Sequence, residues 1–180
     1  GCDHAGIDLK PHVIAVLEEL NLPYRDFGTF THDRVDYPVY GELAARAVAS
    51  GECELGIIMC GTGVGIGIAA NKVEGIRCVM CSDCYSALMS REHNDANMLS
   101  MGARVVGSEL AKMIVRTWLT ATFNGERHAR RVAQIATLDA LSGGRTLFSA
   151  GIGWSREESR HLNQDYDTRV QRMEDALKVL

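Results

Sequence analysis

The sequence lacks the features that would mark a membrane, secreted or nucleic-acid-binding protein. No apolar run approaches the roughly 18 residues that a membrane-spanning helix needs, and no signal-peptide pattern opens the chain. Lys and Arg number 19 against 23 Asp and Glu and form no basic run, which argues against nucleic acid as the main partner. We therefore expect a cytoplasmic protein with no membrane and no nucleic-acid partner.

Disulfides and metal sites are also not indicated. The six cysteines are scattered through apolar segments, and a disulfide framework is not expected in a domain of this size, so we infer a reducing environment. The spacing Cys78-x-x-Cys81-x-x-Cys84 could suggest a metal. However, no second Cys/His pair follows at zinc-like spacing, and we interpret these cysteines as structural. We expect no metal and no other cofactor.

Strand and helix patterns alternate along most of the 180 residues. Apolar spacing predicts helices over 9–20, 39–50, 82–91, 108–119 and 126–141, with a further helix after a glycine-rich turn near residue 64. Short strands are predicted over 24–27, 55–59, 77–81 and 98–101, the last continuing through 104–107. Such alternation predicts an α/β fold with a parallel sheet covered on both faces, in which ligands bind at the carboxyl ends of the strands.

Two glycines, Gly143 and Gly144, mark a predicted boundary. We divide the chain into a domain over residues 1–141 and a C-terminal extension over 142–180. The extension is expected to be partly helical, because Val170, Met173 and Leu177 recur at helical spacing. A helix docked on its own domain or on a partner explains this stripe better than a catalytic role.

The organising stretch runs from Cys60 to Lys72 and carries four glycines at alternate positions. Glycines leave backbone N–H groups free to point at a ligand, and a helix beginning near Val64 would add its own unpaired N–H groups. The stretch therefore predicts an anion-binding turn with a thiol at its edge, although tight packing alone also explains such turns. The spacing is neither G-x-G-x-x-G nor a Walker sequence, which argues against a nicotinamide dehydrogenase.

Several motifs occur together in an order that is specific as a set. They are Gly-Cys-Asp-His-Ala-Gly at 1–6, Asp-Tyr-Pro at 36–38, Cys-Gly-Thr-Gly-Val-Gly at 60–65, Ala-Ala-Asn-Lys at 69–72, His-Asn-Asp at 93–95 and Arg-Val-Val-Gly at 104–107. With these motifs, residues 1–138 resemble the type B ribose-5-phosphate isomerases, a family that includes galactose- and allose-6-phosphate isomerases. The chain departs from the family by lacking the first strand and by carrying about 40 further residues at its C-terminal end.

The resemblance implies a fold, an assembly and a reaction. The expected fold is a Rossmann-like three-layer α/β/α sandwich with a mainly parallel five-stranded sheet. The expected assembly is a homodimer or a dimer of dimers with the active site between subunits. The reaction is a metal-independent aldose–ketose isomerisation of a phosphorylated sugar, with ribose 5-phosphate and ribulose 5-phosphate as the expected pair and a cis-enediolate as the intermediate.

The same resemblance assigns the chemistry to individual residues. Cys60 is the base that removes a carbon-bound proton, and a helix N-terminus beside it favours the thiolate. The backbone of Gly61, Gly63, Val64 and Gly65 and the hydroxyl of Thr62 stabilise the enediolate oxygens. His93 matches the acid that opens the sugar ring.

The remaining candidates bind the substrate. By resemblance, Asp3 contacts hydroxyls, His4 lies nearer the phosphate, Asn94 hydrogen-bonds sugar oxygens, and Arg104 matches a position that holds the substrate. Arg127 and Arg131 are assigned to the phosphate, and being four residues apart they share one helix face and can converge on a dianion.

Two other functions remain open from the sequence. A hexose-6-phosphate isomerase acting on allose or galactose 6-phosphate would use the same chemistry, and relative kcat/KM on the two sugar classes separates them. A nonenzymatic phosphosugar-binding module would need neither Cys60 nor His93, and their presence argues against it.

Overall fold

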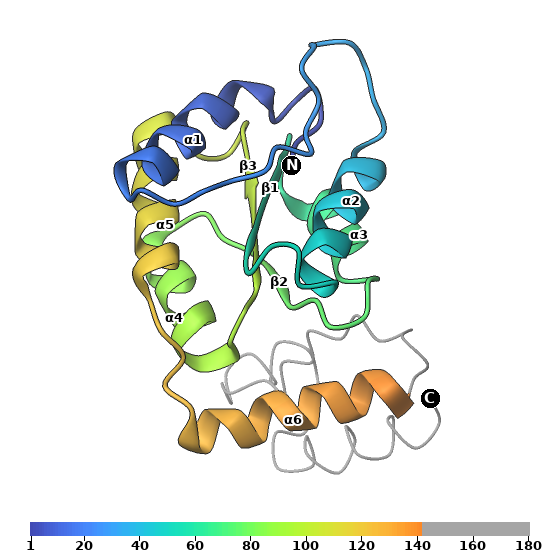
Figure 1. Ribbon diagram of the computed structural model, residues 1–180, viewed down its shortest axis with the longest axis vertical. Helices are drawn as coiled ribbons and strands as arrows, with labels where there is room; N and C mark the ends of the chain where they lie inside the picture. Colours follow the sequence, from blue (N-terminus) through green and yellow to red (C-terminus); the bar gives the residue numbers. More distant parts are fainter. Residues whose placement is uncertain (142–180) are drawn as a thin grey trace, which may run out of the picture. The chain divides into compact units, whose positions relative to one another are not determined.

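The computed structural model describes residues 1–141, with side chains to residue 138 (Figure 1). The elements in chain order are the 3₁₀ helix η1 (Ile7–Leu9), α1 (Lys10–Glu19), α2 (Tyr37–Ala49), β1 (Gly56–Cys60), α3 (Val64–Ala70), β2 (Cys78–Met80), α4 (Cys84–Asn94), β3 (Met98–Gly102), α5 (Ser108–Thr120) and α6 (Glu126–Leu141). Residues up to Thr137 form one compact unit. The predicted extension over 142–180 lies outside the described residues.

The three strands form one parallel sheet in the order β1-β3-β2. Gly56 pairs with Met98 at the amino end of β1, and Cys60 pairs with Gly102 at its carboxyl end. Each strand is followed by a helix, which is the connection that parallel pairing requires. The α/β prediction is confirmed, and β1 and β3 lie where the sequence predicts strands.

Apolar side chains alternate between the two faces of the sheet, so each face has its own core. Met59, Leu99 and Met101 pack with helices α1, α4 and α5 in a cluster that includes the fully buried Trp118. Ile58, Cys60, Cys78 and Met98 pack with α2 and α3 on the other face. The result is the expected arrangement of helices, sheet and helices in three layers (Figure 1).

The expectation of five strands is not met within residues 1–141, where three strands are described. Residues 24–27 form no strand, and within residues 1–141 their backbone makes no hydrogen bond with another backbone group. Residues 104–107 form a turn instead, in which the N–H groups of Val105 and Val106 both donate to the carbonyl of Gly102. A strand needs a paired neighbour as well as apolar side chains.

The N-terminal residues lie along the free edge of β1. Cys2 makes a parallel bridge with Met59, and Asp3 N–H donates to Met59 O at 3.2 Å. This pairing carries Asp3 and His4 to the carboxyl end of the sheet, beside Cys60. Among the described residues no helix has the length and apolar character needed to cross a membrane.

Candidate functional site

Cys60 ends β1 and opens the glycine-rich turn. Its side chain is only 4% exposed, and its Sγ accepts a hydrogen bond from Gly63 N–H at 3.2 Å. Gly63 has φ +80°, a left-handed conformation that glycine adopts without strain, and it immediately precedes α3. The turn therefore folds back so that a backbone N–H points at the sulfur.

Close packing explains why glycines are required around this turn. A Cβ on Gly102 would lie 2.6 Å from the backbone of Thr62, and one on Gly65 would lie 2.6 Å from the Tyr37 ring. The hydroxyl of Ser100 also donates to the carbonyl of Gly63. These contacts fix the turn against β3, and they leave the Thr62 and Val64 side chains exposed.

The other strand-end cysteines differ from Cys60 in their surroundings. Burial raises the pKa of Cys78 to about 12 and that of Cys81 to about 11, so both thiols stay protonated near neutral pH. Within residues 1–141, neither of these two sulfurs accepts a backbone N–H as Cys60 Sγ does. The structural interpretation of Cys78 and Cys81 agrees with this environment.

Asp3 and His4 lie close to the glycine turn. Asp3 is 4% exposed, and its Oδ1 accepts N–H bonds from Ala5 and Gly6, both at 2.9 Å. One carboxylate oxygen therefore stabilises the chain turn. His4 Nδ1 accepts the N–H of Val35 at 3.2 Å, which places the proton of the neutral imidazole on Nε2.

Arg104 completes this group of residues, which we call the Cys60 cluster. Its N–H donates to Gly61 O at 3.0 Å, and a Cβ built on Gly61 would lie 3.6 Å from its guanidinium carbon. Arg104 and His4 both line a hollow of about 440 Å³ that also includes Asp8, His12 and Ser108. The Cys60 cluster thus consists of Asp3, His4, Cys60–Gly65 and Arg104.

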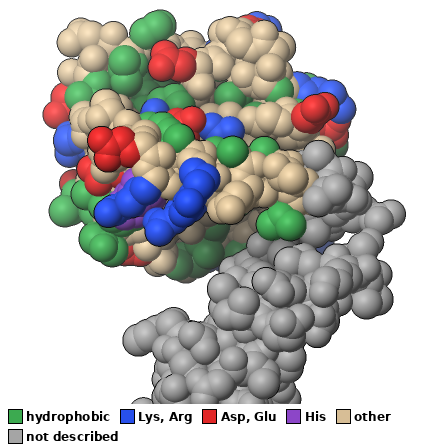
Figure 2. Space-filling view, turned by 90° about the horizontal axis from the view of Figure 1, so that it is seen from below, with side chains coloured by type: hydrophobic (Ala, Val, Ile, Leu, Met, Phe, Trp, Pro, Cys, Tyr) green, Lys and Arg blue, Asp and Glu red, His purple; other side chains and the backbone are tan. Residues whose placement is uncertain are grey.

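A second group lies at the end of α4. His93 and Asn94, which the sequence suggested as loop residues, occupy the last turn of this helix. The His93 ring stacks on the His128 ring, with centroids 4.1 Å apart and planes inclined by 7°. Arg127 Nε donates to His128 Nε2 at 3.2 Å. Figure 2 shows Lys and Arg side chains gathered beside histidine on this face.

His128 is a site residue that sequence reasoning did not select. It is 5% exposed, and burial, together with the nearby positive charges of His93, Arg127 and Arg131, lowers its pKa. With Nε2 accepting from Arg127, the neutral ring carries its proton on Nδ1. The sequence did contain a signal for His128, its place in the Arg-His-Ala-Arg-Arg segment at 127–131. Residues three apart in a helix are neighbours on its surface, so His128 lies beside the arginines of this segment.

The loop after α4 is held by a second residue that the sequence did not indicate, Arg77. Its guanidinium donates to the backbone oxygens of Asn94 and Asp95 and to Asp95 Oδ2, the last at 2.8 Å. Asp95 has φ +48° and ends the helix. Arg77 therefore fixes the end of α4 that presents His93. We call His93, Asn94, Arg127, His128 and Arg131 the His93 cluster.

The two clusters lie at opposite ends of the sheet. Cys60 is at the carboxyl end of β1, whereas α4 runs back to the amino end, where β3 begins at Met98 (Figure 1). Five strand residues separate these ends by about 13 Å along the strand axis. The structure thus brings the predicted residues together in two groups, and it does not bring Cys60 and His93 together within one chain.

Three arginines of these clusters carry unpaired charge. Arg104, Arg127 and Arg131 are exposed, and none of them forms an ion pair within residues 1–141. In the same part of the chain, no group of three or more His, Cys, Asp or Glu side chains is arranged to hold a metal ion. The polar groups available are thus suited to an oxygen-rich anion.

Family models match two parts of the chain. The model described as Ribose/Galactose Isomerase matches residues 1–135, three quarters of the sequence. A model described as Luciferase-like monooxygenase matches residues 115–180, which is well under half of the sequence. Only the first match is long enough to assign the chain.

Individual relatives agree with the first match. The chain is 54% identical over 139 residues to "Ribose-5-phosphate isomerase B" of Escherichia coli (strain K12), covering 77% of this chain and 93% of that protein. It is 38% identical over 132 residues to "Galactose-6-phosphate isomerase subunit LacB" of Clostridium acetobutylicum, covering 73% and 76%. The solved structure of Clostridium thermocellum ribose-5-phosphate isomerase B is 52% identical, with a TM-score of 0.77 and coverage of 79% and 96%.

Proposed function

The chain belongs to the ribose/galactose isomerase family and is a sugar-phosphate isomerase, and from this premise we propose that it interconverts ribose 5-phosphate and ribulose 5-phosphate through a cis-enediolate, with Cys60 as the base. The identity of 54% to a ribose-5-phosphate isomerase, against 38% to a galactose-6-phosphate isomerase subunit, favours the pentose phosphate. The observation that carries the mechanism is the turn that directs the N–H of Gly63 to Cys60 Sγ.

The reaction moves one proton between two carbons. In the proposed mechanism the Cys60 thiolate takes the proton from C2 of the open-chain aldose, and the electron pair of that C–H bond becomes the C1–C2 double bond of the enediolate. The same proton returns to C1, while a proton moves between the two oxygens. An N–H directed at the sulfur stabilises negative charge there.

Charge that develops on O1 and O2 needs donors in fixed positions. The backbone of Gly61–Gly65 supplies N–H groups, and close contacts with β3 and Tyr37 hold that backbone in place. The Thr62 oxygen accepts Val64 N–H at 3.3 Å, which leaves its O–H free to donate to a substrate oxygen. Removing one such donor typically costs about 3–4 kcal/mol of transition-state stabilisation.

Ring opening and phosphate binding are assigned to the His93 cluster. His93 transfers the proton between the ring oxygen and the C1 hydroxyl, and Asn94 hydrogen-bonds sugar oxygens. Arg127 and Arg131 bind the phosphate, supported by their exposure and by their lack of ion pairs within residues 1–141. His4 and Arg104, which share one hollow, contact the substrate from the Cys60 side.

The placement of the two clusters at opposite ends of the sheet supports a site to which two chains contribute. We propose a two-fold homodimer in which the Cys60 cluster of one copy faces the His93 cluster of the other, so that each dimer has two equivalent sites. Val64, which belongs to the Cys60 cluster, and Ile68 form an exposed apolar face on α3, 46% and 43% exposed. A partner that covers this face would also close the site to water.

The proposal is tested by isomerisation of ribose 5-phosphate in the presence of EDTA. We expect turnover by the unchanged chain and loss of at least about a thousandfold in kcat for Cys60→Ala, which removes the base. Cys81→Ala is the matched control, since this buried thiol lies outside the site, and it should retain kcat.

Each result has a clear consequence. Equal activity of Cys60→Ala and the unchanged chain would reject the thiolate mechanism. Higher kcat/KM on allose or galactose 6-phosphate than on ribose 5-phosphate would replace the pentose assignment by the hexose one. A folded protein that binds these sugars without turnover would favour a phosphosugar-binding module.

The six thiols are free, which supports the proposed cytoplasmic location.

A further inference from the structure

Ser100 is a polar side chain in an otherwise apolar strand. β3 reads Met-Leu-Ser-Met-Gly and is buried along its whole length, with Ser100 completely buried. Its register partner on β1 is Ile58, and both side chains lie on the face of the sheet that α2 and α3 cover. A buried hydroxyl costs free energy unless it is hydrogen-bonded, so the bond that Ser100 makes indicates what it is there for.

That bond leads out of the strand. The hydroxyl of Ser100 donates to the carbonyl of Gly63, 37 positions earlier in the chain. Another buried serine, Ser90, shows the ordinary arrangement, in which the hydroxyl donates within its own helix, to Ala87 O at 2.8 Å. Ser100 therefore ties β3 to the glycine turn and does not satisfy a group of its own element.

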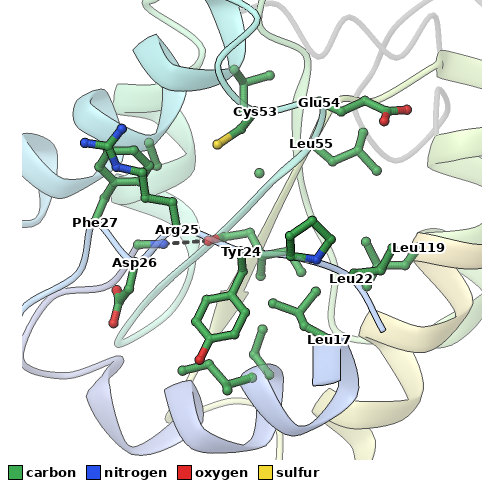
Figure 3. Close-up of a pocket in the computed structure, with 18 of the residues that line it drawn as sticks. Leu17, Leu22, Tyr24, Arg25, Asp26, Phe27, Cys53, Glu54, Leu55 and Leu119 are labelled. Atoms are coloured by element: carbon green, nitrogen blue, oxygen red, sulfur yellow. Dashed lines mark hydrogen bonds between the residues drawn. The ribbon is translucent and has the colours of Figure 1, made fainter. Parts of the chain in front are cut away.

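The turn receives no support from the apolar cavity at the other side of the chain. That cavity has a volume of about 430 Å³ and is lined by residues such as Leu17, Tyr24 and Leu55 (Figure 3), and none of residues 60–65 borders it. Support for the turn comes instead from β3, where Ser100 lies.

The carbonyl that Ser100 holds belongs to the peptide joining Gly63 to Val64. This peptide is trans, so its N–H points away from its C=O. With the C=O directed at Ser100 beneath the turn, the Val64 N–H points to the exposed side, where it meets Thr62 Oγ1 at 3.3 Å. Ser100 thus sets the direction of a backbone donor that the proposed mechanism uses for the enediolate oxygens.

Glycine makes this orientation easy to lose. Gly63 adopts both signs of φ readily, so the peptide that follows it can rotate. The next helix adds little restraint, because α3 has seven residues, of which Gly65 and Gly67 are poor helix formers. Its bond to the same carbonyl, from Gly67 N–H, is 3.2 Å long. A carbonyl oxygen accepts two hydrogen bonds, and Ser100 supplies the second.

We propose that Ser100 is a positioning residue for the isomerisation. Its hydroxyl holds the Gly63–Val64 peptide against β3, which keeps Gly63 N–H on Cys60 Sγ and Val64 N–H on the substrate side of the turn. Ser100 itself does not touch the substrate, because it is completely buried. The effect on turnover rests on the proposed function, whereas the effect on the turn follows from these contacts alone.

The test compares Ser100→Ala with the unchanged chain and with Ser90→Ala, a matched control that also loses one buried hydroxyl-to-carbonyl bond. One readout needs no substrate. It is hydrogen exchange of the Gly63 amide relative to that of Ala103, whose N–H donates to Cys60 O at 2.9 Å. The other readout is kcat and KM with ribose 5-phosphate.

Ser100→Ala should speed exchange at Gly63 by about tenfold more than at Ala103, because only the first amide depends on the held peptide. It should lower kcat by about tenfold or more with KM little changed, since the displaced donor acts on charge that develops during the reaction. Ser90→Ala should do neither.

A second variant separates positioning from stability. A Cβ on Gly67 would lie 3.3 Å from both Cβ and Oγ of Ser100, and removal of the hydroxyl relieves one of these contacts. Ser100→Ala combined with Gly67→Ala should regain most of the Tm that Ser100→Ala loses, because alanine favours a helix over glycine. It should not regain kcat. The same double variant provides the folded protein if Ser100→Ala alone unfolds.

Three results would overturn the proposal: unchanged kcat in Ser100→Ala, equal acceleration of exchange at Gly63 and Ala103, or recovery of kcat together with Tm in the double variant. Failure of the proposed function would appear elsewhere, as turnover by Cys60→Ala, and it would leave the exchange result at Gly63 unaffected. The two failures are therefore distinguishable.

Discussion

Gly63 is the residue on which the shape of the glycine turn depends most. It has φ +80°, and a Cβ there would lie 2.8 Å from the carbonyl carbon of Met101. Gly63→Ala should therefore lower the free energy of unfolding by about 2–4 kcal/mol, combining left-handed strain with overpacking. Gly75→Ala is the matched control, because Gly75 has φ +83° with nothing within 4 Å of its Cβ position.

Gly75→Ala should cost only about 1 kcal/mol, the strain alone. Urea unfolding of both variants measures the difference. Equal losses would show that the close approach to Met101 does not constrain the turn.

His128 should make stability depend on pH. Its pKa is lowered in the folded state, first by burial and then by the charge of His93, so the unfolded chain binds more protons as pH falls below about 6.5. The free energy of unfolding should therefore fall from pH 7.5 to pH 5.5, and His128→Asn should reduce this slope. His32→Asn, at an exposed histidine, is the control and should leave the slope unchanged. Urea unfolding at both pH values tests this, and an unchanged slope in His128→Asn would contradict it.

Sequence reasoning identified residues whose role depends on their neighbours in the chain. It missed residues whose role depends on contacts with distant parts of the chain. The turn after Cys60 could be predicted because an apolar strand and four glycines are adjacent in the chain. His128 and Arg77 could not, since their roles come from stacking on His93 and from bonding the carbonyls after α4, contacts that span 35 and 18 positions. Spacing along the chain says little about such contacts.

At the scale of elements, the end of α4 decides where His93 lies. Arg77 holds this end through a fork of hydrogen bonds to Asp95, at 2.9 Å from Nε and 2.7 Å from Nη2 to the backbone oxygen. Lysine keeps the charge but cannot form the fork. Arg77→Lys should therefore lower the free energy of unfolding by about 1–2 kcal/mol and kcat by about tenfold, with KM little changed.

The control is Arg46→Lys, on the exposed surface of α2, where a single i,i+4 ion pair with Glu42 is affected. It should alter neither stability nor kcat measurably. If Arg77→Lys lost stability but kept kcat, Arg77 would support the helix without positioning His93.

Element boundaries were predicted well where a local signal exists. Asp83 accepts Ser86 N–H at 2.7 Å and caps α4, which begins at Cys84, within two residues of the predicted start at 82. The strand predicted over 24–27 shows the limit of such reasoning. Its apolar and aromatic residues suit a strand, yet pairing depends on a neighbour that the sequence pattern of the segment cannot reveal.

At the scale of the whole molecule, the two clusters explain why catalysis should require two chains. Each chain places Cys60, the proposed base, at one end of the sheet and His93, the proposed ring-opening acid, at the other. The alternating pattern of strands and helices predicted the sheet, and the carboxyl ends of its strands predicted the Cys60 cluster. The alternating pattern did not predict that α4 places His93 at the opposite end of the sheet, because that position depends on the length and direction of the helix.

A composite site makes a quantitative prediction for mixtures of two inactive chains. Cys60→Ala and His93→Asn should each be inactive as homodimers. When they are refolded together in equal amounts, half of the dimers carry both chains, and each mixed dimer has one site with intact Cys60 and intact His93 and one site with neither. The mixture should therefore regain about a quarter of the unchanged kcat per chain, measured with ribose 5-phosphate.

The control is a mixture of Cys60→Ala with Cys60→Ala, His93→Asn, in which no site has an intact Cys60. That mixture should stay inactive. If each chain instead completed its own site by moving His93 to Cys60, neither mixture would regain activity, because every chain would still lack one of the two groups. Recovery near a quarter thus distinguishes sharing between chains from rearrangement within one, and it follows directly from the opposite placement of Cys60 and His93 on a single sheet.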